Sequence, residues 1–215
     1  MFLATCITFS AHAELFISEY VEGTSYNKAV EIFNSGTSPV SLSNYSLKLY
    51  SNGASSPSSS MTLSGTISPN QALVACHNSA DQTIKSAATF ISSTVINFNG
   101  DDAVALFNGS AIVDVFGRIG YDPGSYWGSG GTTTQDHTLR RKSSVTTGDP
   151  IGSNPFVPII EWDFYAVNTF DGLGSHTIDG GGNTIPIASN PIPSSQVLSI
   201  SPPMYNCLSL EQIRI

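Results

Sequence analysis

The sequence predicts an all-β fold, a sandwich or a barrel, on three observations. Only 11% of the 215 residues are charged and 40% are hydrophobic. This composition is too apolar for a disordered chain and too poor in Lys, Glu and Arg for long exposed helices. The 19 Gly and 12 Pro residues separate short apolar runs, which is typical of β-domains with frequent turns. The length fits one compact domain with short appendages.

Residues 1–13 have the pattern that ends a secretory signal peptide. They carry no charge, and an apolar run over residues 2–9 precedes Ala11 and Ala13, the small residues that signal cleavage favours. The run is too short to cross a membrane, and the basic start of the signal is expected before Met1. We therefore expect a secreted or cell-surface product without a membrane span. The alternative is an N-terminal strand that packs on the domain.

Residues 14–177 are predicted to form one β-domain, because short apolar runs alternate with turn clusters throughout. In its first half, strands are expected at residues 15–20, at 29–34, in two pieces of 40–49 broken at Ser43-Asn44, at Ile67 and at 72–76. The last two are expected to form a hairpin around Ser68-Pro69-Asn70. A loop of Ser, Gly and Pro occupies residues 51–60, and residues 84–89 are the only segment with helical character.

In the second half, three apolar runs are separated by Asn-Gly turns. The runs are residues 94–98, 103–107 and 111–116. Asn-Gly is a strong hairpin signal because both residues accept positive φ, so the three runs are expected to be consecutive antiparallel neighbours. A Gly-rich loop with aromatic residues follows at 117–131. A short basic strand at 137–142 and a last strand at 156–164 complete the domain.

Residues 178–215 are predicted to be a linker and the start of a following segment. The Gly-rich stretch at 179–183 is typical of a flexible linker, and the five prolines beyond it disfavour a packed element. The apolar end, residues 205–215, is expected to begin another domain or to be an out-of-frame ending.

Several motifs of residues 15–177 together resemble the lamin-tail domain in the form found in bacterial secreted proteins and extracellular nucleases. They are ISEYVEG (17–23) with NKAVEI (27–32), LSNYSLKL (42–49), FNGDDAVAL (98–106), DVFGRIG (114–120) with DPG (122–124) and WG (127–128), and HTLRRK (137–142). The resemblance rests on their order and spacing over about three quarters of the chain. It implies an immunoglobulin-like antiparallel β-sandwich without catalytic activity, appended to other modules. In the bacterial nucleases the hydrolytic domain lies C-terminal to it.

The charge balance works against nucleic acid and anionic lipid as partners, with one local exception. Acidic residues outnumber basic ones 16 to 8, which gives a net charge of −8 and repels phosphate. The exception is a basic-aromatic surface of seven candidate ligand residues, Arg118, Tyr121, Tyr126, Trp127, Arg140, Arg141 and Lys142. Aromatic rings among cations stack on bases or grip a polysaccharide, so a polyanion or a glycan is the candidate partner.

The alternative for the same surface is structural. Trp127 would then close one end of the sandwich, and the three basic residues 140–142 would pair with Asp136 and Asp149. Both alternatives stay open on the sequence alone.

The carboxylates suggest no catalytic or metal site. Asp101 and Asp102, with Asp122, have the ligand type that Ca²⁺ prefers, but the alternating spacing of a calcium loop is absent. We expect Asp101 to bond the turn backbone and Asp102 to be solvated. Three glutamates, Glu19, Glu22 and Glu31, alternate with apolar neighbours. They are expected at the surface or in ion pairs on half-exposed strands, rather than as a glycosidase pair.

The histidines and cysteines suggest no cofactor. His77, His137 and His176 lack zinc-site spacing, and no phosphate-loop, dinucleotide or nucleophile-elbow motif occurs in a strand-turn-helix context. Cys76 is expected to be a buried small hydrophobe, with a disulfide to Cys207 as the alternative.

The sequence thus predicts a non-catalytic extracellular binding or docking module, the N-terminal accessory domain of a nuclease-like protein. The alternatives are a cell-surface adhesion or structural module, and a fragment of a secreted metal-dependent nuclease whose catalytic domain lies elsewhere.

Overall fold

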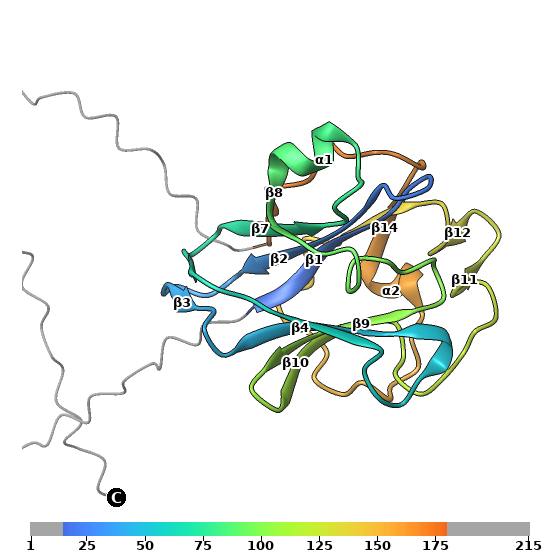
Figure 1. Cartoon of the computed structure of the whole chain (residues 1–215), viewed down its shortest axis with the longest axis horizontal. Coiled ribbons are helices and arrows are strands. Elements are labelled where there is room, and N and C mark those ends of the chain that lie inside the picture. Colours follow the sequence, from blue (N-terminus) through green and yellow to red (C-terminus); the bar gives the residue numbers. More distant parts are fainter. Residues whose placement is uncertain (1–14, 180–215) are drawn as a thin grey trace, which may run out of the picture. The chain divides into compact units, whose positions relative to one another are not determined.

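The computed structural model describes residues 15–179, so the predicted signal peptide, residues 1–13, and most of the predicted linker lie outside the described residues. Two sheets pack face to face (Figure 1). The larger sheet has the strand order β14 (Trp162–Tyr165), β13 (Thr138–Arg141), β1 (Leu15–Glu22), β2 (Lys28–Asn34), β7 (Ala72–Cys76) and β8 (Ala88–Ile91). The smaller has the order β10 (Ala111–Phe116), β9 (Ala103–Asn108), β4 (Tyr45–Tyr50) and β5 (Ser59–Thr62).

Four very short strands form two further pairs. They are β3 (Val40–Ser41) with β6 (Thr66–Ile67), and β11 (Gly128–Ser129) with β12 (Thr132–Thr133). A 3₁₀ turn at Ser51–Gly53 and two short helices, α1 (Gln82–Ala87) and α2 (Pro158–Glu161), complete the described elements. Neither helix has the length and apolarity that a membrane span needs. The predicted all-β, immunoglobulin-like sandwich is confirmed.

One strand pair departs from the antiparallel prediction. β7 and β8 run parallel, and parallel neighbours need a crossover rather than a tight turn. The crossover carries α1, the predicted helical segment, which begins where Asp81 accepts a hydrogen bond from the Thr83 amide at 2.7 Å and which buries Ile84.

The β9–β10 hairpin is confirmed, and its turn is Asn108-Gly109. Two other expected pairings are wrong. Ile67 pairs with Val40 instead of with the strand at 72–76, which lies between β2 and β8. Residues 94–98 form no strand, because β4 occupies the place beside β9. In the last expected strand, residues 156–164, only the end is extended, since α2 precedes β14.

The core between the sheets is built around stacked aromatic rings. Tyr20 of β1 stacks on Phe116 of β10 with ring centroids 3.9 Å apart and on Phe98 at 4.5 Å. Trp162 meets Phe116 edge to face at 5.0 Å. Phe98 therefore belongs to the core without belonging to a strand, and such ring pairs add to the stabilisation from burial.

Both outer faces of the sandwich are covered as well. On the larger sheet, Phe170 and Leu173 of the segment 166–179 pack with α1 over Val21 and Cys76. On the smaller sheet, Trp127 packs over Ala103, Ala105 and Phe107 of β9. β1 and β2 are consequently buried along their whole length, so the expectation of half-exposed strands is wrong.

Candidate functional site

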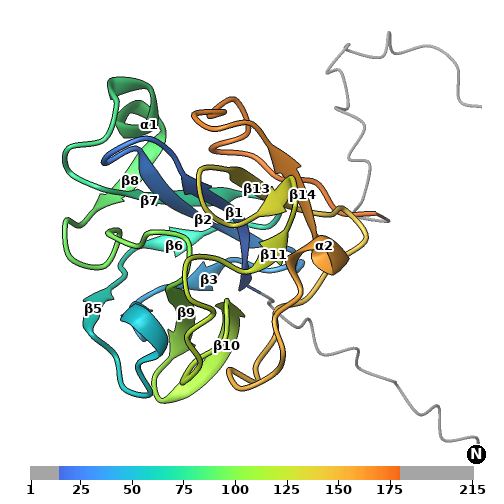
Figure 2. The same cartoon turned by 90° about the vertical axis from the view of Figure 1, so that its right-hand side faces the viewer.

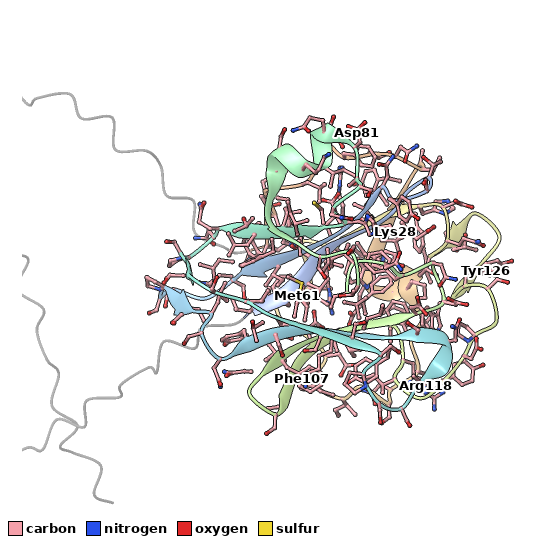
Figure 3. The ribbon with its side chains drawn as sticks, viewed as in Figure 1. Lys28, Met61, Asp81, Phe107, Arg118 and Tyr126 are labelled. Carbon is pink, nitrogen blue, oxygen red and sulfur yellow. The ribbon has the colours of Figure 1, made fainter. Side chains whose placement is uncertain are left out.

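The structure divides the predicted basic-aromatic surface into two regions. Arg118, Tyr121, Tyr126 and Trp127 line one cleft together with Pro123, Gly128, Pro155 and Phe156, and we call this set the aromatic cleft. Arg140 and Arg141 line a separate hollow with residues of β14 and the segment 166–179. Figure 3 shows Arg118 and Tyr126 on the same side of the domain.

Arg141 belongs to a buried ionic network that joins the two sheets. Its side chain is 1% exposed, and it donates to Asp114 Oδ2 and Glu161 Oε2, each at 2.6 Å. Asp114 on β10 also accepts the amides of Ile17 at 2.7 Å and Asp149 at 2.8 Å. The Ile17 amide lies at a bulge of β1. Arg141 therefore holds this bulge against β10 and is unavailable to a ligand.

Arg140 and Lys142 also have partners within the domain. Arg140 pairs with Asp171 and with Glu19, and its guanidinium lies 4.2 Å from the ring centroid of Tyr165. Lys142 Nζ donates to the carbonyl oxygens of Ile159 and Ile160. The expected ion pairs with Asp136 and Asp149 are wrong. The two arginines pair with carboxylates of β1, β10, α2 and the segment 166–179, and Lys142 binds carbonyl oxygens of α2.

The aromatic cleft has a volume of about 340 Å³, within the range of small-ligand sites, roughly 300–1,000 Å³. Tyr121 and Tyr126 are 49% and 42% exposed, while Trp127 is 5% exposed. The Arg118 guanidinium lies 4.9 Å from the ring centroid of Tyr121 and forms no ion pair within residues 15–179. None of the described residues that line the cleft is acidic.

The loop that carries the cleft is fixed by hydrogen bonds to distant segments. The Trp127 amide donates to Thr134 Oγ1 at 3.0 Å, and Thr134 Oγ1 donates to Gly100 O at 2.5 Å. Nearer the start of the loop, the Ile119 amide donates to Gly152 O at 2.8 Å. Gly128 has φ of +92°, and a Cβ there would collide with the carbonyl of Thr132. The exposed tyrosines are therefore held by a preorganised loop.

The walls of the cleft bring together two loops that are far apart in sequence. β12 packs against α2, and Figure 2 shows β11, the hairpin partner of β12, beside α2. Pro155 and Phe156 lie beside Trp127, whose ring meets Phe156 edge to face at 5.5 Å. Trp127 thus covers the outer face of the smaller sheet and does not close an end of the sandwich. Sequence reasoning missed Pro155 and Phe156, because it assigned Phe156 to a strand.

Comparison with known families now identifies the fold. The Lamin Tail Domain family model matches residues 8–120, which is more than half of the chain. The chain belongs to the lamin tail domain family. This is a family of non-catalytic, immunoglobulin-like domains. No curated protein and no solved structure matches the chain. Of the cleft residues, only Arg118 lies within the matched range.

In this lamin tail domain, the three glutamates of β1 and β2 are buried, each with a partner. Glu22 pairs with Lys28 at 2.5 Å, and Glu31 accepts from Ser18 Oγ and from the Gly174 amide, both at 2.6 Å. Glu19 and Glu31 lie opposite each other on β1 and β2. Burial raises the pKa of Glu19 to about 7, although Arg140 opposes the shift. The segment 166–179 covers this pair, because Gly174 donates to Glu31 and Asp171 pairs with Arg140 beside Glu19.

Asp101 and Asp102 are buried, and the expectation that Asp102 is solvated is wrong. Asp102 Oδ1 accepts the Asn52 amide at 2.8 Å, and burial raises the pKa of both carboxyl groups. Within residues 15–179 there is no group of three or more His, Cys, Asp or Glu side chains placed to hold a metal ion.

The histidines occupy separate places. His77 stacks on Tyr26, His137 Nδ1 lies 2.7 Å from Gln135 O, and His176 packs edge to face on Phe16 and Phe33. Burial lowers the pKa of His176 to about 4. Cys76 is buried and forms no disulfide among the described residues, as expected for a small core hydrophobe, while Cys207 lies outside them.

Proposed function

We propose that this lamin tail domain is a non-catalytic extracellular binding or docking module whose ligand occupies the aromatic cleft. The observation that carries the proposal is the fixed loop that presents Tyr121 and Tyr126 to solvent beside Arg118. Ordering a loop costs conformational entropy, and a surface that is ordered before binding loses less freedom when a ligand arrives. Exposed aromatic rings beside a few polar groups are typical of ligand sites.

The extracellular location and the parent protein are parts of the same proposal. Support for secretion comes from the uncharged apolar run and small residues of positions 1–13. Support for a nuclease-like parent comes from the motifs that resemble the bacterial form of the domain. In such a parent the domain would hold the enzyme near its substrate or matrix, and hydrolysis would belong to another domain.

A retention experiment with the full chain tests the binding role. Immobilised polygalacturonate, dextran, heparin and single-stranded DNA serve as probes. We expect at least one probe to retain the chain, and Tyr126→Ser to abolish retention because it removes an exposed face of the cleft. Tyr26→Ser is the matched control, since Tyr26 is also an exposed tyrosine but lies on His77.

Three results would contradict the proposed function. The first is the absence of retention on all four probes, and the second is retention that Tyr126→Ser leaves intact. The third is turnover of DNA or RNA by the purified chain with Mg²⁺, Mn²⁺ or Ca²⁺, because the proposal assigns no catalytic residue to this domain.

A further inference from the structure

We infer that the aromatic cleft takes a uronic acid residue of an acidic polysaccharide, with the sugar ring on the tyrosines and the carboxylate on Arg118. The inference rests on the proposed function, since it names the ligand class of the same cleft. It follows from the charge of the cleft, from its shape and from the partners that already bind Arg140, Arg141 and Lys142.

The charge of the cleft is opposite to that of the chain. The chain has 16 acidic and 8 basic residues, yet the described lining of the cleft contains one cation and no carboxylate. Arg118 forms no ion pair within residues 15–179, whereas Arg140 and Arg141 each contact two carboxylates. A planar guanidinium binds a carboxylate through two parallel hydrogen bonds, so Arg118 provides a place for one carboxylate.

The rest of the cleft suits a ring with apolar faces. Tyr121, Tyr126 and Trp127 contribute aromatic surface, and Pro123 and Pro155 contribute flat aliphatic surface. A pyranose has C–H faces that pack on such surfaces and hydroxyl groups at its edge that remain in water. The volume of about 340 Å³ lies at the small end for ligand sites, which fits one sugar residue of a longer chain.

The same cleft is a poor site for a nucleic acid strand. Single-stranded nucleic acids bind where stacking rings accompany a positively charged groove that follows the phosphates. Here Arg118 is the one cation among the described residues that line the cleft. Arg140, Arg141 and Lys142 lie outside this lining and are bound to carboxylates and carbonyl oxygens.

A neutral sugar would also fit less well than an acidic one. It would cover the Arg118 guanidinium without providing a counter-charge, and a desolvated charge without a partner is costly. The structure therefore predicts that the cleft selects acidic over neutral sugars and that this selectivity depends on Arg118.

Calorimetry on the full chain tests this ligand class. The probes are trigalacturonate, its neutral methyl ester, trimannuronate, a hyaluronan tetrasaccharide and an oligo-dT strand. We expect the free acid to bind at least about tenfold more tightly than its methyl ester, which corresponds to about 1.4 kcal/mol. The two other acidic sugars distinguish which source of uronate fits the cleft.

Variants separate the two parts of the recognition. Arg118→Gln is expected to remove the preference for the acid, because it weakens binding of the acid and relieves the desolvation cost that the ester meets at the guanidinium. Tyr126→Ser is expected to weaken binding of both. Lys85→Gln, at a lysine outside the cleft, and Tyr26→Ser are the controls and should change neither.

The outcomes distinguish this inference from the proposed function. Equal affinity for acid and ester, or a preference for oligo-dT that Tyr126→Ser abolishes, would overturn the uronate inference and leave the cleft as a binding site. An acid preference that persists in Arg118→Gln would also overturn it. Binding of none of the probes would overturn both this inference and the proposed function.

Discussion

The aromatic cleft and the Arg141 network use the same residue type for opposite purposes. Arg118 lies over an exposed tyrosine without an ion pair in the described part of the chain, whereas Arg141 is enclosed by Asp114, Glu161 and the rings of Phe16 and Trp162. In the sequence both appear as cations near aromatic residues. In the structure one cation remains available and the other connects two sheets.

The difference shows that the position of carboxylates decides what a cation near aromatic rings does. Asp114 lies 27 residues from Arg141 along the chain and reaches it because β10 packs against β1, which pairs with β13. In the aromatic cleft, the carboxylate nearest along the chain, Asp122, accepts the Gly124 amide at 2.7 Å and is not part of the lining. A comparison of variants in the two regions should therefore separate stability from binding.

The largest effect is expected in the Arg141 network. Arg141→Ala leaves Asp114 buried without its counter-charge, and breaking a buried pair in this way costs about 3–5 kcal/mol. We expect a loss of this size in the free energy of unfolding, measured by urea denaturation. Lys142→Ala is the neighbouring control, since Lys142 only donates to two carbonyl oxygens at the surface.

A small loss for Arg141→Ala, comparable with that for Lys142→Ala, would contradict the assignment of Arg141 to the structural network. The double variant Arg141→Met with Asp114→Asn sharpens the test, because the Asn side chain still offers an oxygen to the amides that Asp114 accepts. It removes both charges at once, and it should be less destabilised than Arg141→Ala if the unpaired carboxylate is the main cost.

An intermediate effect that depends on pH is expected at Glu19. Burial raises its pKa to about 7 from an ordinary value of 4.5, so between these values the folded state holds a proton that the unfolded state has lost. The contribution of Glu19 to stability is then full below about pH 4.5 and is lost as pH rises through 7. At about 1.4 kcal/mol per pKa unit, the loss is at most about 3–4 kcal/mol.

The measurement is the difference in free energy of unfolding between the wild type and Glu19→Gln at several pH values. Taking this difference cancels the contributions of the other titrating groups to the pH dependence of stability. One of them is His176, whose lowered pKa makes stability rise, rather than fall, as pH increases from about 4 to 6.5. A difference that does not change between pH 5 and 8 would show that Glu19 keeps its ordinary pKa, through Arg140.

The sequence predicted the parts of the fold that depend on local pattern. β1, β2 and the β9–β10 hairpin follow from apolar runs and an Asn-Gly turn. The wrong assignments involve distant partners. Ile67 pairs with Val40, 27 residues earlier in the chain, rather than with the strand that follows it. The apolar residues of 94–98 fill the core, a role that periodicity cannot distinguish from a short buried strand.

The candidate site, too, could be predicted from the sequence only where its residues are close together along the chain. The loop with Arg118, Tyr121, Tyr126 and Trp127 is contiguous in sequence, and the structure keeps these residues together. Arg140 and Arg141 lie next to each other on β13, and successive strand residues point to opposite faces. Which carboxylates meet each of them depends on β10 and on the segment 166–179, and no local pattern encodes these contacts.

The smallest effect on stability is expected in the aromatic cleft. Tyr126 is 42% exposed, and Arg118 forms no ion pair in the described chain. Substitutions of surface residues that are not part of a buried network usually change stability by less than about 0.5 kcal/mol. We expect Tyr126→Ser and Arg118→Gln to unfold in urea at the wild-type midpoint while they alter ligand binding. A destabilisation above about 1 kcal/mol would mean that these side chains stabilise the loop rather than bind a ligand. Arg118 would then have a structural role, as Arg141 has, and would differ from it only in the size of its contribution to stability.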